Sequence, residues 1–173
     1  MSSNIALFGF MGVGKTVVGR ALAERLALKY VDLDDEIVKH EGKSIPDIFS
    51  EEGEAAFRAA ESNISARVAS KEGQVIACGG GTVLNPGNVK ALKATSFMVL
   101  LTAEPETILK RVESEGETRP LLMVDDKIGR IESLLRARNP SYLHAADLII
   151  DTTGLTPHDV ADIIVSNLGG MDA

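Results

Sequence analysis

The stretch Gly9-Phe10-Met11-Gly12-Val13-Gly14-Lys15-Thr16 decides how the rest of this sequence is interpreted. An apolar run, Ile5 to Phe8, precedes it, and a stretch with apolar residues at helical spacing, Lys15 to Leu28, follows it. A glycine-rich loop of this spacing between a strand and a helix is the pattern of the phosphate-binding loop, or P-loop. A tight glycine turn followed by an exposed lysine is the alternative. The context on both sides favours the P-loop.

The chemistry of a P-loop accounts for these residue types. Glycines let backbone N–H groups approach phosphate oxygens, and the start of the next helix adds partial positive charge. We expect Lys15 to neutralise the β- and γ-phosphate oxygens and Thr16 to offer its hydroxyl to Mg²⁺. No Asn-Lys-x-Asp or Thr-Lys-x-Asp segment, which would indicate a guanine base, follows the fourth predicted strand. ATP is therefore the expected nucleotide, with contacts to Gly12, Val13, Gly14, Lys15, Thr16 and Val17.

Short apolar runs alternate with longer amphipathic stretches along the chain. The runs that predict strands are Ile5 to Phe8, Tyr30 to Leu33, Val75 to Cys78, Phe97 to Leu101 and Leu148 to Ile150. The stretches that predict helices are Lys15 to Leu28, Ser62 to Ala69 and Pro157 to Leu168, with Gly169 as a helix stop. This alternation is typical of a parallel sheet covered by helices. The predicted fold class is α/β, a three-layer α/β/α P-loop NTPase fold with a central five-stranded parallel sheet, similar to the nucleoside monophosphate kinases.

We expect residues 1–173 to form a single domain, because no linker or repeat interrupts the pattern. The polar segment Ser114 to Asp126, which contains Gly116 and Arg119-Pro120, lies between two helical patterns. It has the composition of a flexible lid over the nucleotide. An ordinary surface loop is the alternative.

Composition excludes several classes of function. The net charge of −7 and the pI of about 5.0 argue against nucleic acid and anionic membrane surfaces as partners, since both need a basic footprint. No apolar run approaches the roughly 20 residues of a membrane span. The one cysteine, Cys78, and the three scattered histidines give neither a disulfide nor a zinc site. We expect a cytoplasmic monomer that uses small-molecule substrates.

Two carboxylates follow the second apolar run. If Asp32 and Asp34 both lie on that strand, they share one face at the carboxyl edge of the sheet, where ligands bind. Asp32 would then bind Mg²⁺ together with Thr16, and Asp34 would accept a hydrogen bond from a substrate hydroxyl. Alternatively, an aspartate here caps a helix that starts near Asp35.

Three further features have both a functional and a structural interpretation. Arg58 lies between Glu54 and Glu61 at helical spacing, as in a surface ion-pair array. Gly79-Gly80-Gly81 follows the third strand, and three glycines exceed what a turn requires, which indicates close approach to a ligand. Arg138 precedes Asn139-Pro140, and a cation at a helix end is favoured by the macrodipole in any case. Arg136 would point about 200° away from Arg138 on an ideal helix.

Taken together, these residues resemble the shikimate kinase family over nearly the whole chain. The segments that carry the resemblance are the P-loop, Asp32-Leu33-Asp34, Phe57-Arg58-x-x-Glu61, the triple glycine, Thr118-Arg119-Pro120-Leu121-Leu122, and Arg138-Asn139-Pro140-x-Tyr142 with Ala145-Ala146. Their order and spacing are more specific than a P-loop alone.

The resemblance implies transfer of the ATP γ-phosphoryl group to the 3-hydroxyl of shikimate, which gives shikimate 3-phosphate and ADP on the route to chorismate and the aromatic amino acids. It implies that shikimate is held by Asp34, Arg58, Gly79, Gly80, Gly81 and Arg138. It implies that Lys15, Asp34 and Arg119 are catalytic, with Arg119 also on the ATP phosphates and Arg111 against adenine. The expected cofactors are ATP as co-substrate and Mg²⁺.

Two positions depart from the family pattern. Cys78 stands where a small hydroxyl residue is frequent, and we interpret it as a small side chain and not a nucleophile. Leu155 stands near a position at which some members have an adenine-side arginine. The alternatives are a related P-loop kinase of another small hydroxylated acid such as gluconate, and a non-catalytic nucleotide-binding protein. The arginine pair with the triple glycine favours a ring carboxylate, and the presence of Lys15, Asp34 and Arg119 favours catalysis.

Overall fold

The predicted strands form one parallel sheet in the computed structural model, which describes residues 3–116 and 119–169. The strands are β1 (Asn4–Phe8), β2 (Lys29–Asp32), β3 (Gln74–Ala77), β4 (Ser96–Thr102) and β5 (Leu148–Asp151). Within the described residues the sheet has five strands in the order β2-β3-β1-β4-β5. β1 is central and all its residues are buried, which explains why the first run is apolar throughout. The predicted five-stranded parallel sheet is confirmed.

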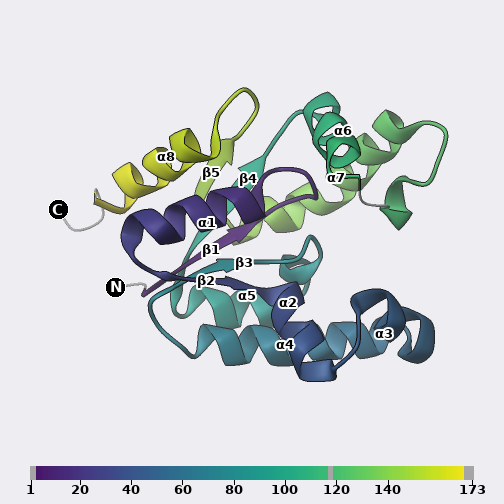
Figure 1. Ribbon diagram of the computed structural model, residues 1–173, viewed down its shortest axis with the longest axis horizontal. Coiled ribbons are helices and arrows are strands. Elements are labelled where there is room, and N and C mark those ends of the chain that lie inside the picture. Colours follow the sequence, from purple (N-terminus) through teal and green to yellow (C-terminus); the bar gives the residue numbers. More distant parts are fainter. Residues whose placement is uncertain (1–2, 117–118, 170–173) are drawn as a thin grey trace.

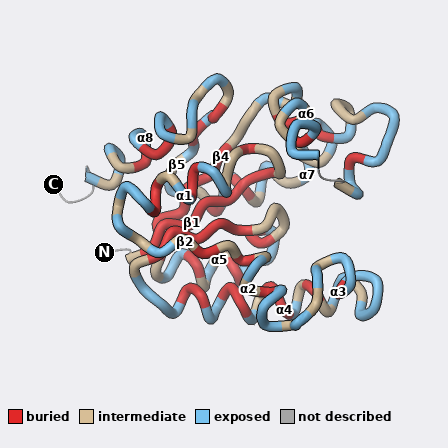
Figure 2. The backbone as a smooth tube through the Cα atoms, viewed as in Figure 1, coloured by how far each residue is buried: buried red, intermediate tan, exposed pale blue. Residues whose placement is uncertain are grey.

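Helices cover both faces of this sheet (Figure 1). The helices are α1 (Lys15–Leu26), α2 (Leu33–Glu41), α3 (Ile45–Glu52), α4 (Glu54–Ala69), α5 (Pro86–Lys93), α6 (Pro105–Ser114), α7 (Lys127–Ala145) and α8 (Pro157–Gly169), with 3₁₀ turns η1 (Thr82–Leu84) and η2 (Pro120–Leu122). α1 packs against α8, whereas α4 packs against α5, and both α5 and α7 contact β4. Figure 2 shows the buried strands between the helices and the exposed outer sides of those helices. The three-layer arrangement is therefore the predicted one.

The second strand ends earlier than the sequence indicated. β2 ends at Asp32, and α2 begins at Leu33. The Oδ1 atom of Asp32 accepts hydrogen bonds from the backbone N–H groups of Asp34 (2.9 Å) and Asp35 (3.2 Å), so that Asp32 caps the helix. The expectation that Asp32 and Asp34 share one strand face is wrong, because this cap turns the chain into a helix between them. The capping alternative holds for Asp32.

Helix α7 is longer than the sequence indicated. It continues through Pro140 to Ala145, so Arg138 lies inside the helix and not at its end. A proline inside a helix removes one backbone hydrogen bond, and here packing of the last turns maintains the helix: Tyr142 and Ala145 are buried. Arg138 and Tyr142, four residues apart, therefore lie on the same face.

Two other segments bear on the site. α4 begins at Glu54, eight residues before the predicted helix, and so carries Arg58 and Glu61. In the segment predicted as a lid, Ser114 ends α6 and η2 follows, while Glu117 and Thr118 lie outside the described residues. Among the helices that the structure describes, none combines the length and apolarity that a membrane span needs.

Candidate active site

The P-loop joins the end of β1 to the start of α1. Gly9 has a φ of 144°, and a Cβ atom at this position would collide with the backbone carbonyl oxygen of Leu101 on β4. Only glycine fits there, because the neighbouring atom belongs to the backbone and cannot rotate away. Lys15 then begins α1, with Gly14 as its N-terminal cap residue. The predicted strand, loop and helix are all present.

Lys15 is half-buried at the end of this loop. Its ammonium group donates hydrogen bonds to the carbonyl oxygens of Gly9 (2.6 Å) and Phe10 (3.2 Å). Burial, which disfavours the charged form, lowers the pKa of Lys15 from 10.5 to about 8. At neutral pH the side chain is still largely protonated, as a phosphate-binding lysine must be.

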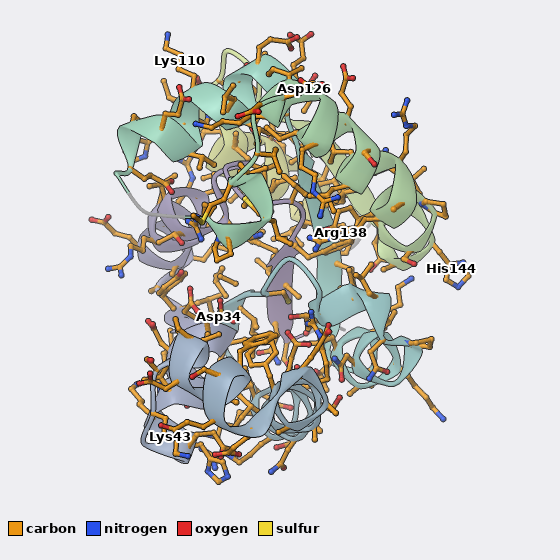
Figure 3. The ribbon with its side chains drawn as sticks, turned by 90° about the vertical axis from the view of Figure 1, so that its right-hand side faces the viewer. Asp34, Lys43, Lys110, Asp126, Arg138 and His144 are labelled. Carbon is orange, nitrogen blue, oxygen red and sulfur yellow. The ribbon has the colours of Figure 1, made fainter. Side chains whose placement is uncertain are left out.

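A cavity of about 340 Å³ opens in front of the loop. Its lining includes residues of the P-loop and the start of α1, of α2, α4 and α7, and the glycines after β3. The predicted residues that line it are Gly12, Gly14, Lys15, Thr16, Val17, Asp32, Asp34, Arg58, Gly79, Gly80, Gly81, Arg119 and Arg138. In Figure 3, Arg138 on α7 and Asp34 on α2 lie in the middle of this end of the molecule, whereas Lys43 and Asp126 lie at its bottom and top.

Asp34 reaches the cavity from the first turn of α2. Burial, followed by the negative charge of Asp32, raises the pKa of Asp34 from 3.8 to about 6. A Cβ atom on Gly79 would lie 3.1 Å from the Oδ1 atom of Asp34, so this carboxylate is close to the glycine loop. The group is ionised at neutral pH but titrates close to it.

Arg58 is held by a buried carboxylate. Its Nη1 atom donates to Oε1 of Glu61 at 2.9 Å, and the Thr82 hydroxyl donates to Oε2 of the same glutamate at 3.0 Å. Because only 2% of Glu61 is exposed, the surface ion-pair interpretation is wrong for this pair. A Cβ atom on Gly81 would lie 2.5 Å from Nη1 of Arg58, so the glycine makes room for the guanidinium.

One face of α7 supplies the other arginine. The guanidinium of Arg138 lies 5.5 Å from the centre of the Phe10 ring, a cation–π arrangement. One turn later the buried Tyr142 donates its hydroxyl to the carbonyl oxygen of Gly80 at 2.6 Å. Arg136 is exposed and does not line the cavity. The choice of Arg138 over Arg136 is consistent with this geometry.

A second cavity, of about 280 Å³, lies beside the P-loop. Apolar side chains of Val17, Leu155 and Val160 line it together with Arg111. Arg111 donates to the Gly12 carbonyl (3.2 Å) and to the hydroxyl (2.9 Å) and carbonyl (3.0 Å) of Thr152. A largely apolar slot with one flat cation suits a purine base.

Thr152 links three segments at this cavity. It follows β5 directly, and its hydroxyl lies 3.0 Å from the Val13 carbonyl oxygen and 2.9 Å from that of Thr102, donating its proton to one of them. Sequence patterns did not predict a role for Thr152 or Thr82, or the contact made by Tyr142. The signal for Thr152 was its position just after a strand at the ligand-binding edge of the sheet.

Arg119 and Cys78 complete the predicted set. Nη2 of Arg119 donates to Oε2 of Glu115 at 3.1 Å, and Arg119 lines the main cavity. Cys78 is buried, and this burial raises the pKa of its thiol to about 12. The thiol is therefore protonated, as expected of a packing residue and not of a nucleophile.

The predicted metal ligands fit a hard cation. Thr16 and Asp32 line the same cavity and offer a hydroxyl and a carboxylate, the oxygen donors that Mg²⁺ prefers. The Oδ1 atom of Asp32 caps α2, and its Oδ2 atom accepts a hydrogen bond from the Tyr30 hydroxyl at 3.4 Å. A carboxylate oxygen that accepts one bond still has capacity for a second partner. Few protein ligands suffice for Mg²⁺ at a phosphate site, because phosphates and water supply the others.

Comparison with known proteins agrees with this geometry. A model of the shikimate kinase family matches residues 11–169. Shikimate kinase of Symbiobacterium thermophilum is 45% identical over 166 residues, which cover 95% of this chain and 95% of that protein. Shikimate kinase of Caldicellulosiruptor bescii is 44% identical over 163 residues, with 94% of each chain covered. The structure of shikimate kinase from Acinetobacter baumannii in complex with shikimate matches with a TM-score of 0.90 at 36% identity, over 97% of this chain and 93% of that one.

Proposed function

This chain belongs to the shikimate kinase family, and we propose that its central cavity transfers the γ-phosphoryl group of ATP to the 3-hydroxyl of shikimate. The products are shikimate 3-phosphate and ADP, and the reaction belongs to the synthesis of chorismate and the aromatic amino acids. One observation carries the proposal. The P-loop residues Gly12, Gly14, Lys15 and Thr16 line the same cavity of about 340 Å³ as Asp34, Arg58 and Arg138.

The part of the cavity formed by Asp34, Arg58, Arg138 and the triple glycine suits a small ring carboxylate. Arg58 and Arg138 supply two permanently charged guanidinium groups, whose planar geometry matches a carboxylate. The triple glycine leaves room for the side chains of Asp34, Arg138 and Arg58 beside the backbone. Glu61 keeps Arg58 in position through its 2.9 Å ion pair. Asp34 is the carboxylate available to the reacting hydroxyl.

Catalysis then follows from position and charge. Asp34 accepts a hydrogen bond from the 3-hydroxyl and takes its proton as the oxygen forms a bond to the γ-phosphorus. The bond from that phosphorus to the β–γ bridging oxygen breaks, and Lys15 and Arg119 offset the negative charge on the transferring group. The segment Ser114 to Asp126 excludes water when it closes over the nucleotide.

Mg²⁺ would be held by the Thr16 hydroxyl and the Asp32 carboxylate together with the nucleotide phosphates. Its contribution is to neutralise charge on the β- and γ-phosphates.

We also propose that the protein is a monomer in the cytoplasm. All residues assigned to the site come from one chain, and the single cysteine is compatible with a reducing compartment. Sedimentation equilibrium with and without both substrates tests the monomer. A dimer at enzyme concentrations used in assays would contradict it.

ADP release from MgATP, measured with and without shikimate, tests the function. Shikimate should stimulate release strongly, while gluconate and AMP should not. Stimulation by gluconate instead would mean that the protein is a P-loop kinase with a different substrate. Nucleotide binding without stimulation by any compound would support a non-catalytic protein.

Arg138→Ala, with Arg136→Ala as its matched control on the same helix, tests the substrate side. Loss of a charged hydrogen-bonding partner should raise the KM for shikimate roughly 10- to 100-fold and leave the KM for ATP within about twofold. Arg136 is exposed, so its replacement should change neither constant. If the two variants change the KM for shikimate equally, Arg138 does not bind shikimate.

A further inference from the structure

The main cavity and the smaller apolar cavity meet at a small set of residues. The residues that line both are Gly12, Gly14, Val17 and Glu115. The main cavity contains the phosphate-binding residues, and the smaller one has the character of a base pocket. In a nucleoside triphosphate the ribose joins the base to the phosphates. The sugar of a nucleotide that occupies both cavities therefore lies against these shared residues.

Glu115 is the polar side chain of that shared set. The other members of the set expose backbone and one valine side chain, whereas Glu115 has a carboxylate. It lies at the end of α6, where its backbone N–H bonds to the Arg111 carbonyl at 3.1 Å. This places it one turn beyond the arginine that lines the base cavity.

The ion pair with Arg119 directs the Glu115 side chain. Oε2 of Glu115 accepts from Nη2 of Arg119 at 3.1 Å, and Arg119 itself lines the main cavity. A carboxylate has two oxygens and about four acceptor positions, so one bond to Arg119 leaves capacity for other donors. Ribose hydroxyls are donors of the right kind, whereas phosphate oxygens would repel the carboxylate.

We propose that Glu115 is the ribose-binding residue of the nucleotide site, accepting hydrogen bonds from the sugar hydroxyls and thereby selecting ribonucleotides over deoxyribonucleotides. The proposal rests on ATP as the phosphoryl donor. It adds a specificity determinant that couples the sugar to Arg119, since one carboxylate contacts both.

A purely structural role for Glu115 predicts a different outcome. If it only orients Arg119, its removal weakens all triphosphates equally, because the contact with Arg119 is independent of the sugar. If it binds the sugar, its removal weakens ATP selectively. The ratio of kcat/KM for ATP to that for 2′-deoxy-ATP or 3′-deoxy-ATP separates the two.

The experiment compares the wild-type protein, Glu115→Ala and Glu115→Gln with these nucleotides at saturating shikimate. Because a hydrogen bond to a charged group is strong, we expect the wild type to prefer ATP over at least one deoxynucleotide by on the order of tenfold or more. Glu115→Ala should bring this ratio close to one, mainly through loss of activity with ATP, and Glu115→Gln should retain part of it. Glu113→Ala is the matched control, because Glu113 lies two residues earlier, pairs with Lys127 at 3.4 Å and lines neither nucleotide cavity.

The Kd values of ADP and 2′-deoxy-ADP, measured by calorimetry, give a readout that does not need shikimate. If shikimate fails to stimulate turnover while the ADP preference is present and lost in Glu115→Ala, the proposed reaction is wrong and the ribose site stands. A wild-type ratio near one for both deoxynucleotides, or an equal loss with all nucleotides in Glu115→Ala, overturns the ribose site alone.

Discussion

Asp34 titrates close to neutral pH because its carboxyl group is buried beside Asp32. If it must be ionised to accept the substrate proton, kcat/KM for shikimate should fall about tenfold per pH unit below pH 6. Lys15, with a pKa of about 8, should produce a decline on the alkaline side. Initial rates from pH 5 to 9 check this bell shape.

The variant Asp34→Asn tests whether Asp34 causes the fall in activity below pH 6. It should lose roughly 10²- to 10⁴-fold in kcat, the usual contribution of a general base, while the Kd of ATP changes little. The residual activity should no longer decline below pH 6. Turnover near that of the wild type, or an unchanged acid limb, would exclude Asp34 from the chemistry.

The same substitution should stabilise the fold at neutral pH. The pKa of Asp34 is about 6 in the folded chain against 3.8 ordinarily, so the folded state binds more protons and stability falls as pH rises from about 4 to about 6. A rise of this size corresponds to roughly 3 kcal/mol, and partial exposure reduces it to about 1–2 kcal/mol. Urea unfolding at pH 7.5 should show Asp34→Asn more stable by this amount.

The difference in stability between Asp34→Asn and the wild type should depend on pH, and this dependence checks the assigned cause. The gain from Asp34→Asn should be complete above about pH 6 and absent below about pH 4, where the carboxyl is protonated in both states. Asp35→Asn serves as a control, because Asp35 is exposed in the same helical turn. This variant should lose at most a few tenths of a kcal/mol in free energy of unfolding. A loss of stability in Asp34→Asn at pH 7.5 would contradict the assigned cause.

At the scale of an element, Asp32 serves helix α2 as well as the cavity. Asparagine also caps helices, whereas alanine does not. Asp32→Asn should therefore keep most of the stability, and Asp32→Ala should lose about 1 kcal/mol more in urea unfolding measured without Mg²⁺. Both variants should need a higher Mg²⁺ concentration for half-maximal activity. If Asp32→Asn has a normal Mg²⁺ requirement, Asp32 is a cap and not a metal ligand.

Element boundaries are where sequence and structure disagree, and each disagreement has a local cause. The alternation of Tyr30, Asp32 and Asp34 suggests a longer strand, but the cap formed by Asp32 ends it. The dipeptide Asn139-Pro140 suggests the end of a helix, but burial of Tyr142 keeps α7 continuous. Capping and tertiary packing decide such points, and neither is contained in periodicity.

Within the candidate site, residues that belong to a sequence motif could be predicted, whereas residues that act only through tertiary contacts could not. Lys15 and Arg138 belong to segments with specific spacing, and both line the cavity. Thr152 lies 139 residues from the Val13 carbonyl that it contacts, and no local pattern reports a pairing over that separation. The catalytic and binding roles of the motif residues remain predictions until the variants are measured.

At the scale of the whole molecule, the nucleotide site joins several strands. Thr152 connects the P-loop after β1 to the ends of β4 and β5. A nucleotide held by this loop should therefore stabilise the sheet as a unit. At 100 times its Kd, ADP contributes about 2.7 kcal/mol, which corresponds to a rise in Tm of roughly 5–10 °C for a chain of this size.

Calorimetric scans with increasing ADP measure that rise. Lys15→Met should show a much smaller shift at the same ADP concentration, because it lacks the phosphate-binding ammonium group. A single transition that moves as a whole is expected. Two transitions, of which only one responds to ADP, would show that part of the chain unfolds independently of the nucleotide site.

The glycines of this site are constrained by two kinds of neighbour, and this difference bears on how the sequence can evolve. Gly9 faces a backbone carbonyl of β4, whereas Gly81 faces the end of the flexible Arg58 side chain. A descendant lineage released from selection for phosphoryl transfer would still need Gly9 in order to fold, while Gly81 and Arg58 would be free to drift together. The first glycine of the P-loop is thus a marker of ancestry, and the pairing of Gly81 with Arg58 is the better marker of retained activity.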